Sequence, residues 1–396
     1  MRAATAFRLL SIAFAATAAA CTDNATTNPI TTNPRVSSAA SLDAQHDEAT
    51  TAEGAVYTMT NATSGNEVVA FHRAADGSLA PIGSFATGGA GTGGKIDPLA
   101  SQYSLLLSDD HKLLFAVNAG SNQVTSFRVA EDGELSRARI TSTGGVAPVS
   151  LAMHGNLLYV LNTGSASVQG YRVGASGELA ALPGASATLP TGSAGAAAIR
   201  FTRDGEQLLV TERGANRIDV FDVRENGRLA AVATYASHGR AAFGFDLTPD
   251  DGVIVSETGS NAPNGGVSSY VLGGGTLTLV TGSVSSGGGA ACWLINTRDG
   301  RFSYVVNAGG ASIGAFAMRE DGSIASIGGA GALTSTGAGS TPLDPAFSSG
   351  DRYLYVLEGG AGNIGGFAVG PDGALTAAGT VHAGAGASGL QGLAAF

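Results

Sequence analysis

The clearest pattern in the chain is an apolar run, a polar turn, an alternating run and a second turn, best seen from Leu113 to Leu135. Leu113 to Val117 is apolar throughout, as expected of a strand that neighbouring sheets cover on both faces. Val124 to Val129 alternates between its two sides, which is the period of a half-buried strand. Asp132-Gly133 is typical of a hairpin turn. The stretch therefore predicts two strands joined by a turn and followed by a hairpin.

The same pattern returns seven times, at intervals of roughly 50 residues. The apolar strand ends at Asn61, Asn118, Asn162, Glu212, Glu257, Asn307 and Glu358. The aromatic residue of the alternating strand returns as Phe71, Phe127, Tyr171, Phe221, Tyr270, Phe316 and Phe367. The hairpin turn returns at Gly77, Gly133, Gly177, Gly227, Gly275, Gly322 and Gly373. Seven repeats of this length without helical periodicity predict an all-β fold, a single seven-bladed β-propeller domain.

An inner strand precedes the apolar strand in every repeat except the first. These inner strands are predicted near Ser101–Ser108, Pro148–Met153, Ala196–Thr202, Ala242–Thr248, Ala290–Thr297 and Leu343–Ser349. The first repeat starts directly with Ala55–Thr60, whereas Gly389–Phe396 is left without a partner at the other end. We therefore expect Gly389–Phe396 to complete the first blade and close the ring, so that no sheet edge stays open.

The N-terminal part has the composition of an export signal followed by a tether. Arg2 and Arg8 precede the apolar run Leu9–Ala20, so residues 1–20 are predicted to be a signal peptide. Cys21 follows small residues as in a bacterial lipobox, which predicts lipidation at Cys21, with plain cleavage as the alternative. Residues 21–54 are rich in Thr, Asn, Ser and Ala and predict a flexible tether before the propeller of residues 55–396. We expect a protein of the cell envelope or periplasm whose membrane contact is a lipid anchor.

The charge balance limits the partners that the protein can have. The net charge is −10, and Lys95 and Lys112 are the only lysines, so a nucleic-acid partner is not expected. The six histidines are scattered singly, which predicts no metal site. Gly89–Ile96 has the spacing of a phosphate-binding loop, but Ile96 stands where Ser or Thr would bind magnesium. We predict no cofactor and expect a monomer.

From about Ala55 to Phe396 the repeats resemble those of the lactonase-like seven-bladed β-propellers. This group includes the bacterial propeller-type 6-phosphogluconolactonase and the fungal 3-carboxymuconate lactonizing enzyme. The resemblance rests on the segments FAVNAGSNQVTSFRV, YVLNTGSASVQGYRV and YVVNAGGASIGAFAM, each followed by a D-G or similar turn. The repeats are also similar to the YVTN-type propellers of bacterial surface proteins. The resemblance implies the propeller fold and, for the first group, action on a lactone.

The resemblance also implies a set of site residues. Glu257 falls on the N-E position of the enzymes, and Glu212 opens the stretch that matches their D-x-G-x-D-R pattern. The G-P-R-H element is missing, and His238 and Arg240 lie nearby along the chain. Lactone opening needs a base that activates water and a cation that holds the oxyanion. The implied roles are Glu257 as base, Arg240 as oxyanion or substrate clamp, and His238 and Glu212 as supporting groups.

Each of these residues also has a structural interpretation. Glu257 and Glu212 occupy the position that Asn holds in other repeats, where the side chain can satisfy the backbone of a turn. His238 and Arg240 can be a solvated pair in a loop. Two functions therefore stay open. One is an exported lactone hydrolase acting on a small sugar lactone or related ring. The other is a noncatalytic cell-envelope propeller that binds a glycan, peptide or protein partner through its loops.

Overall fold

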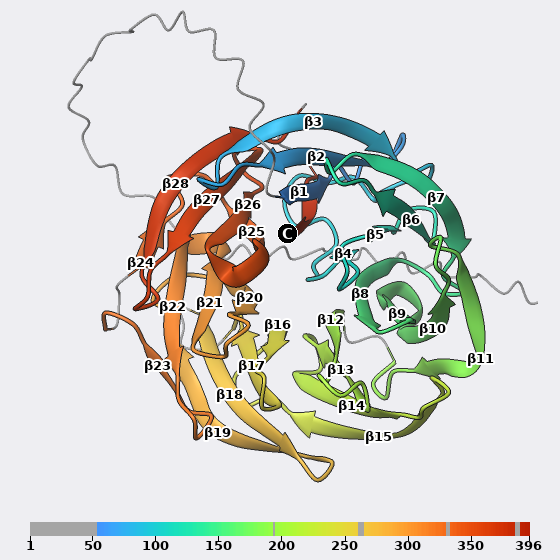
Figure 1. Ribbon diagram of the computed structural model, residues 1–396. Coiled ribbons are helices and arrows are strands. Elements are labelled where there is room, and N and C mark those ends of the chain that lie inside the picture. The colour runs from blue at the N-terminus through green and yellow to red at the C-terminus, as the bar shows by residue number, and fades with distance from the viewer. Residues whose placement is uncertain (1–53, 193–194, 260–264, 330–332, 385–388) are drawn as a thin grey trace, which may run out of the picture.

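The computed structural model describes residues 54–192, 195–259, 265–329, 333–384 and 389–396. Its strands form seven antiparallel sheets arranged as blades around a central axis (Figure 1). The predicted signal peptide, the predicted tether up to residue 53 and Cys21 lie outside the described residues. Within the described ranges, no helix has the length and hydropathy of a membrane-spanning segment. The predicted seven-bladed all-β fold is confirmed.

We number the blades 1 to 7 along the chain. Blade 1 contains β29 (Gln391–Ala395), β1 (Gly54–Met59), β2 (Glu67–Arg73) and β3 (Leu79–Ala86). Blade 2 contains β4 (Leu105–Leu107), β5 (Leu113–Asn118), β6 (Gln123–Val129) and β7 (Leu135–Ser142). Blade 3 contains β8 (Pro148–His154), β9 (Leu157–Asn162), β10 (Ser167–Val173) and β11 (Leu179–Thr188). Blade 4 contains β12 (Ala196–Phe201), β13 (Gln207–Glu212), β14 (Arg217–Val223) and β15 (Leu229–Ala236).

Blade 5 contains β16 (Ala242–Leu247), β17 (Gly252–Glu257), β18 (Gly266–Gly273) and β19 (Thr276–Ser285). Blade 6 contains β20 (Ala291–Asn296), β21 (Phe302–Asn307) and β22 (Ser312–Met318), and both β23 (Ile324–Ser326) and β24 (Leu333–Ser335) pair with β22. Blade 7 contains β25 (Pro342–Phe347), β26 (Tyr353–Glu358), β27 (Asn363–Val369) and β28 (Leu375–His382). Short 3₁₀ helices cover Thr163–Ser165, Ala308–Gly310 and Ser349–Asp351.

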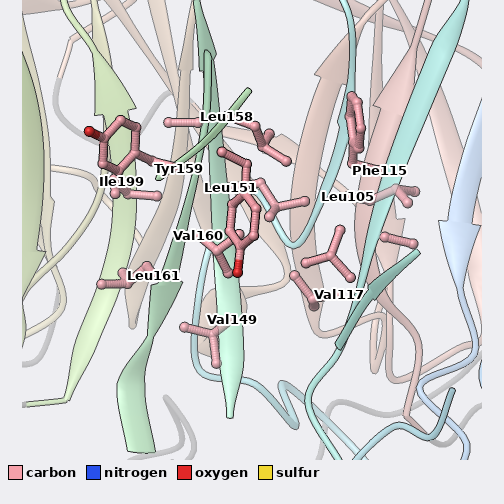
Figure 2. Close-up of a cluster of buried hydrophobic side chains, with 14 of the residues drawn as sticks. Leu105, Phe115, Val117, Val149, Leu151, Leu158, Tyr159, Val160, Leu161 and Ile199 are labelled. Atoms are coloured by element: carbon pink, nitrogen blue, oxygen red, sulfur yellow. The ribbon is translucent and has the colours of Figure 1, made fainter. Parts of the chain in front are cut away.

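The hydrophobic core lies between the blades. The second strands β1, β5, β9, β17 and β21 are buried along their whole length, because another blade covers each of their faces. Figure 2 shows one such interface, where Phe115 and Val117 of β5 approach Val149 and Leu151 of β8. Burial on both faces explains why these strands are apolar runs and not alternating ones.

The ring closes as the sequence predicts. The strand β29 pairs antiparallel with β1, with Val56 opposite Ala395 and Tyr57 opposite Ala394. The hydroxyl of Thr58 donates a 2.8 Å hydrogen bond to the carbonyl oxygen of Gly392. The last strand of the chain is thus the inner strand of the first blade, and the prediction of closure is confirmed.

Tyrosine side chains tie blades to their neighbours. In four blades the second strand carries a tyrosine whose hydroxyl donates to the carbonyl of the hairpin glycine in the next blade. These pairs are Tyr57 with Gly133 at 2.9 Å, Tyr159 with Gly227 at 2.5 Å, Tyr304 with Gly373 at 2.9 Å and Tyr355 with Gly77 at 2.8 Å. The last pair joins blade 7 to blade 1, so the recurring hairpin glycines mark contacts between blades as well as turns.

The substitution Tyr304→Phe is expected to lower the free energy of unfolding by about 1 kcal/mol, because the buried carbonyl of Gly373 loses its donor. Urea unfolding of the purified protein measures the change. Tyr353→Phe is the matched control, since its hydroxyl makes an exposed 3.3 Å bond to Ala75. Equal losses for the two variants would contradict a special role of the buried contact between blades.

The inner strand of blade 2 differs from the prediction. Only Leu105–Leu107 pairs with β5, whereas the strand was expected to start at Ser101. The backbone N–H of Gln102 instead donates to the carbonyl of Ala197 in blade 4 at 3.0 Å. Its side-chain amide donates to the carbonyl of Leu294 in blade 6 and accepts from the N–H of Leu294. We call residues 101–103 the axial segment. Its polar groups find partners on the inner strands across the ring, which removes the need for a ladder with β5.

Candidate functional site

The predicted site residues lie on one face of the ring, on blades 4 and 5 and the loop between them. We call it the loop face: the face on which the inner strands β12 and β16 begin and the second strands β13 and β17 end. Glu212 is the last residue of β13 and Glu257 the last residue of β17. His238 and Arg240 lie in the loop between β15 and β16. The structure therefore brings these four residues onto adjacent blades of one face.

Glu257 is fully buried, and donors occupy both of its carboxylate oxygens. The Oε1 atom accepts from the Ser268 hydroxyl at 2.6 Å, the Gly239 N–H at 2.7 Å and the Ser237 hydroxyl at 3.4 Å. The Oε2 atom accepts from the Ser283 hydroxyl. This side chain joins the loop before β16 to β18 and β19. The geometry matches the structural interpretation of Glu257, and its role as a base stays a prediction.

His238 and Arg240 flank the contact that Glu257 makes with Gly239. Both side chains are exposed on the loop face. The backbone N–H of His238 donates to the Tyr270 hydroxyl at 2.7 Å, which fixes the loop on blade 5. A guanidinium and an imidazole thus stand at the surface beside a buried carboxylate. Their roles toward a substrate stay predictions.

Glu212 has the same repeat position as Glu257 but a different environment. It is also fully buried, and its Oε2 atom accepts from the hydroxyl of Thr191, in the loop before β12. Its Oε1 atom has no hydrogen-bond donor among the described residues. Thr191 is partly exposed, so it connects Glu212 to the surface of the loop face. Of the two glutamates, Glu212 has the less satisfied carboxyl group.

Asp219 on β14 is a carboxyl that the sequence analysis did not select. It is fully buried, and its Oδ1 atom accepts from the Thr234 hydroxyl at 2.7 Å. Its Oδ2 atom, like Oε1 of Glu212, lacks a donor in the described part of the chain. Burial, and then the Glu212 carboxyl, raise the pKa of Asp219 to about 7. The alternating pattern of β14 gave no sign of this pairing, because it depends on the register between β13 and β14.

A second unpredicted group is Arg213, which directly follows Glu212. Its backbone N–H donates to Gly195 at 3.2 Å, and its guanidinium carbon lies 5.7 Å from the ring centroid of Phe243 in blade 5. It is partly exposed. A cation therefore lies at the boundary of blades 4 and 5, beside the end of β13.

Two buried acids lie near each other, Asp344 on the inner strand of blade 7 and Asp97 in the segment before β4. Asp344 of β25 accepts on Oδ2 from the Gln391 amide at 3.1 Å and the Gly392 N–H at 3.0 Å. Burial raises its pKa to about 7. Burial, followed by the charge of Asp344, also raises the pKa of Asp97 well above its usual range. Asp344 thus ties the start of β29 to blade 7.

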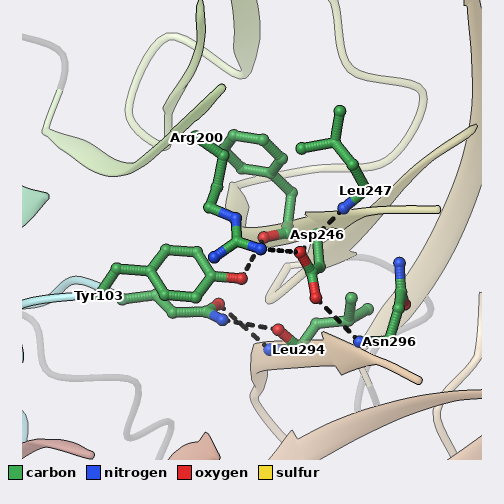
Figure 3. A network of polar contacts seen from close by, with 8 residues as sticks. Tyr103, Arg200, Asp246, Leu247, Leu294 and Asn296 are labelled. Atoms are coloured by element: carbon green, nitrogen blue, oxygen red, sulfur yellow. Dashed lines mark hydrogen bonds and ion pairs between the residues drawn. The ribbon is translucent and has the colours of Figure 1, made fainter. Parts of the chain in front are cut away.

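An ion pair and its hydrogen bonds hold the axial segment against blades 4, 5 and 6 (Figure 3). The guanidinium of Arg200 donates to Asp246 at 2.8 Å and lies 4.5 Å from the ring centroid of Tyr103. The other carboxylate oxygen of Asp246 accepts from the Asn296 N–H at 3.0 Å. The Tyr103 hydroxyl donates to the carbonyl of Phe245 at 2.8 Å. This network binds inner strands to one another and is a structural element of the axis.

The described residues contain no group of three or more His, Cys, Asp or Glu side chains that could hold a metal ion. A cavity of about 120 Å³ lies between blade 7 and the hairpin of blade 1, lined by residues that include Tyr355, Gly366 and Gly77. It is therefore remote from the boundary of blades 4 and 5. The chemistry that the loop face offers is that of carboxyl, hydroxyl, imidazole and guanidinium groups.

Comparison with solved structures places the fold among bacterial propellers. A periplasmic gluconolactonase of Pseudomonas aeruginosa is 22% identical, with a TM-score of 0.64 over 85% of this chain and 98% of the other. A Bacteroides fragilis protein described as a candidate 6-phosphogluconolactonase is 19% identical, with a TM-score of 0.68 over 88% and 100%. A Lactobacillus plantarum protein is 16% identical, with a TM-score of 0.69 over 87% and 99%. At these identities the likeness shows the fold.

A comparison with curated protein sequences gave no match. A family model does match the chain. The model described as "Lactonase, 7-bladed beta-propeller" aligns with residues 55–189 and 178–261, which together span more than half of the sequence. The matched region includes blades 2 to 4, most of blade 1, and β16 and β17 of blade 5, so it contains all the candidate residues on the loop face. The chain therefore belongs to the lactonase family of seven-bladed β-propellers.

Proposed function

We propose that the protein hydrolyses a small lactone at the loop face of blades 4 and 5. The observation that carries this proposal is the match to the lactonase family model, because it covers the strands that present the candidate residues. The gluconolactonase and the candidate 6-phosphogluconolactonase among the similar folds suggest a sugar lactone as the substrate class. The surface there supplies the two functions that lactone opening needs, a base and a cation.

We assign the base to Glu212 because its carboxyl has an under-satisfied oxygen and reaches the surface through Thr191. A water molecule that attacks the lactone carbonyl would give its proton to Thr191, whose own proton passes to Glu212. Arg213 and Arg240 are cations on this face that can hold the oxyanion. Glu257 and His238 support the loop that carries Arg240.

The location of the protein is a further part of the proposal. The Arg-containing apolar segment of residues 1–20 and Cys21 support export and a lipid anchor at the cell envelope or in the periplasm. The similar fold of a periplasmic gluconolactonase is consistent with that location. The small number of lysines supports a small-molecule partner over nucleic acid. A monomer stays our expectation.

Proton release during incubation with a panel of sugar and aliphatic lactones tests the proposal. We expect turnover by the unmodified protein and a loss of about 100-fold or more in Glu212→Gln, because a general base contributes that much. Glu358→Gln is the matched control, since Glu358 has the same repeat position in blade 7, away from the site. If a folded Glu257→Gln variant lost lactone turnover while Glu212→Gln stayed fully active, the base would be Glu257 and not Glu212. Absence of turnover with every lactone would favour the noncatalytic binding propeller.

A further inference from the structure

The pair of Glu212 and Asp219 is unlike any other contact at this position of the repeat. In each blade we compare the third-strand residue that pairs with the second-strand residue two positions before the closing Asn or Glu. In chain order it is Val68, Thr125, Gln169, Asp219, Ser268, Gly314 and Gly365. Blade 4 is thus the blade with an acid here. In blade 5 the corresponding Ser268 donates to Glu257, so a hydroxyl there satisfies the glutamate.

The hydrogen bonds around the pair leave room for one proton. Each carboxyl has one oxygen that a threonine hydroxyl caps, Thr191 for Glu212 and Thr234 for Asp219. The other two oxygens, Oε1 of Glu212 and Oδ2 of Asp219, are buried and have no donor in the described ranges. Two acceptors satisfy each other only when one carboxyl is protonated. Two buried carboxylates side by side are also unfavourable when both are ionised.

The surroundings supply little charge that would remove this proton. On the same strand as Asp219, the positive charge of Arg217 opposes the rise of the Asp219 pKa. The strand β15 faces it with the uncharged Thr234. In blade 3, β9 and β11 have no charged residue, and Arg172 of β10 bonds the side chain of Asn156 at 2.8 Å. The balance favours a protonated carboxyl at neutral pH, in agreement with the raised pKa of Asp219.

We propose that Glu212 and Asp219 share one proton at neutral pH, and that Asp219 is the positioning residue that presents Glu212 to Thr191 as the base for lactone opening. The catalytic half of this inference depends on the proposed function. The shared proton fixes Oε1 of Glu212 against Asp219 and leaves Oε2 for the Thr191 hydroxyl. Water then forms the new bond to the lactone carbonyl carbon as its proton passes through Thr191 to Glu212. The ring C–O bond breaks when the proton returns to the ring oxygen, and the pair ends with the one proton with which it began.

The first test needs no substrate. A carboxyl whose pKa rises from about 4 in the unfolded chain to about 7 in the folded protein stabilises the fold below pH 4, and this contribution is lost as the pH rises to 7. Across that range the folding equilibrium constant should fall by roughly two to three orders of magnitude more in the unmodified protein than in Asp219→Ser. The serine reproduces the arrangement around Glu257 in blade 5. Asp219→Asn is the isosteric second variant should the serine variant fold poorly.

The second test uses lactone turnover as a function of pH. In the unmodified protein the rate should fall as the pH rises through about 7, because ionised Asp219 repels Glu212 and removes its fixed orientation. In Asp219→Ser, which has no group to ionise there, this alkaline decline should be absent. The inference would be overturned if the unmodified protein and Asp219→Ser had parallel pH curves, both for stability and for rate. If the unmodified protein turns over no lactone, the proposed function and the catalytic half of the inference fail together, and the stability curves alone decide whether the proton is shared.

Discussion

Removal of residues 389–396 is expected to lower the free energy of unfolding by on the order of 5 kcal/mol or more, enough to unfold many domains. The deletion takes away the inner strand of blade 1 and leaves β1 with an open edge. It exposes the partners of Leu390 and Leu393, each worth about 2 kcal/mol when buried. It also removes Gln391, whose amide donates to Asp344 and to the carbonyl of Ser101 at 3.2 Å.

Thermal melting of the shortened and the full-length protein measures this effect. Addition of a synthetic peptide with the sequence of residues 389–396 should restore part of the lost stability, because the peptide can occupy the vacant edge of β1. The milder variant Leu393→Ala should lower stability by about 2 kcal/mol and leave the ring closed. A melting temperature that does not change on deletion would show that β29 contributes nothing to closure.

The second large effect is expected for Asp246→Ala, which should cost about 3 kcal/mol or more. The substitution leaves the guanidinium of Arg200 without its carboxylate and the N–H groups of Asn296 and Leu247 without acceptors. Breaking a buried ion pair from one side leaves a charge that the interior cannot solvate. Arg200 is one-third exposed, so water lessens the penalty and we take the lower end of the usual range.

Urea unfolding of Asp246→Ala and of the double variant with Arg200→Leu separates the two contributions. The double variant should recover part of the loss, because the stranded charge is then absent. Lys112→Ala serves as a control, since Lys112 and Asp110 form an exposed pair at 3.8 Å, and its change should stay within about 0.5 kcal/mol. A loss no larger than that control in Asp246→Ala would mean that the axial ion pair does not support the ring.

The fold could be predicted from the sequence because its repeats are regular. The apolar second strands and the hairpin glycines recur at a fixed order, and each marks a contact that every blade has to make. The closing strand followed from counting, since Gly389–Phe396 was the inner strand that lacked its blade. The start of blade 2 could not be predicted, because the sequence of the axial segment does not differ from that of the first residues of a strand. Only contacts with Ala197 and Leu294 on distant blades distinguish them.

The candidate site was predictable in position and less so in chemistry. Glu212 and Glu257 could be selected because they fall on motif positions of the lactonase-like propellers that the repeats resemble. Their difference arises from neighbours on other strands, a serine beside Glu257 and an acid beside Glu212. By its sequence pattern, Asp219 is an ordinary polar residue of an alternating strand. Its burial depends on the covering blade, which no local pattern shows.

The axial segment also bears on how the chain can fold. In a linear repeat protein each unit contacts only its neighbours, so structure can spread from any point. Here Gln102 bonds Leu294 across 192 residues of chain, and Thr58 bonds Gly392 across 334. Contacts of such sequence separation are entropically costly to form and slow folding. Blades 1 and 2, though made first by the ribosome, can complete their hydrogen bonds only after blade 6 and the last strand exist, so the ring must assemble late and as one cooperative unit.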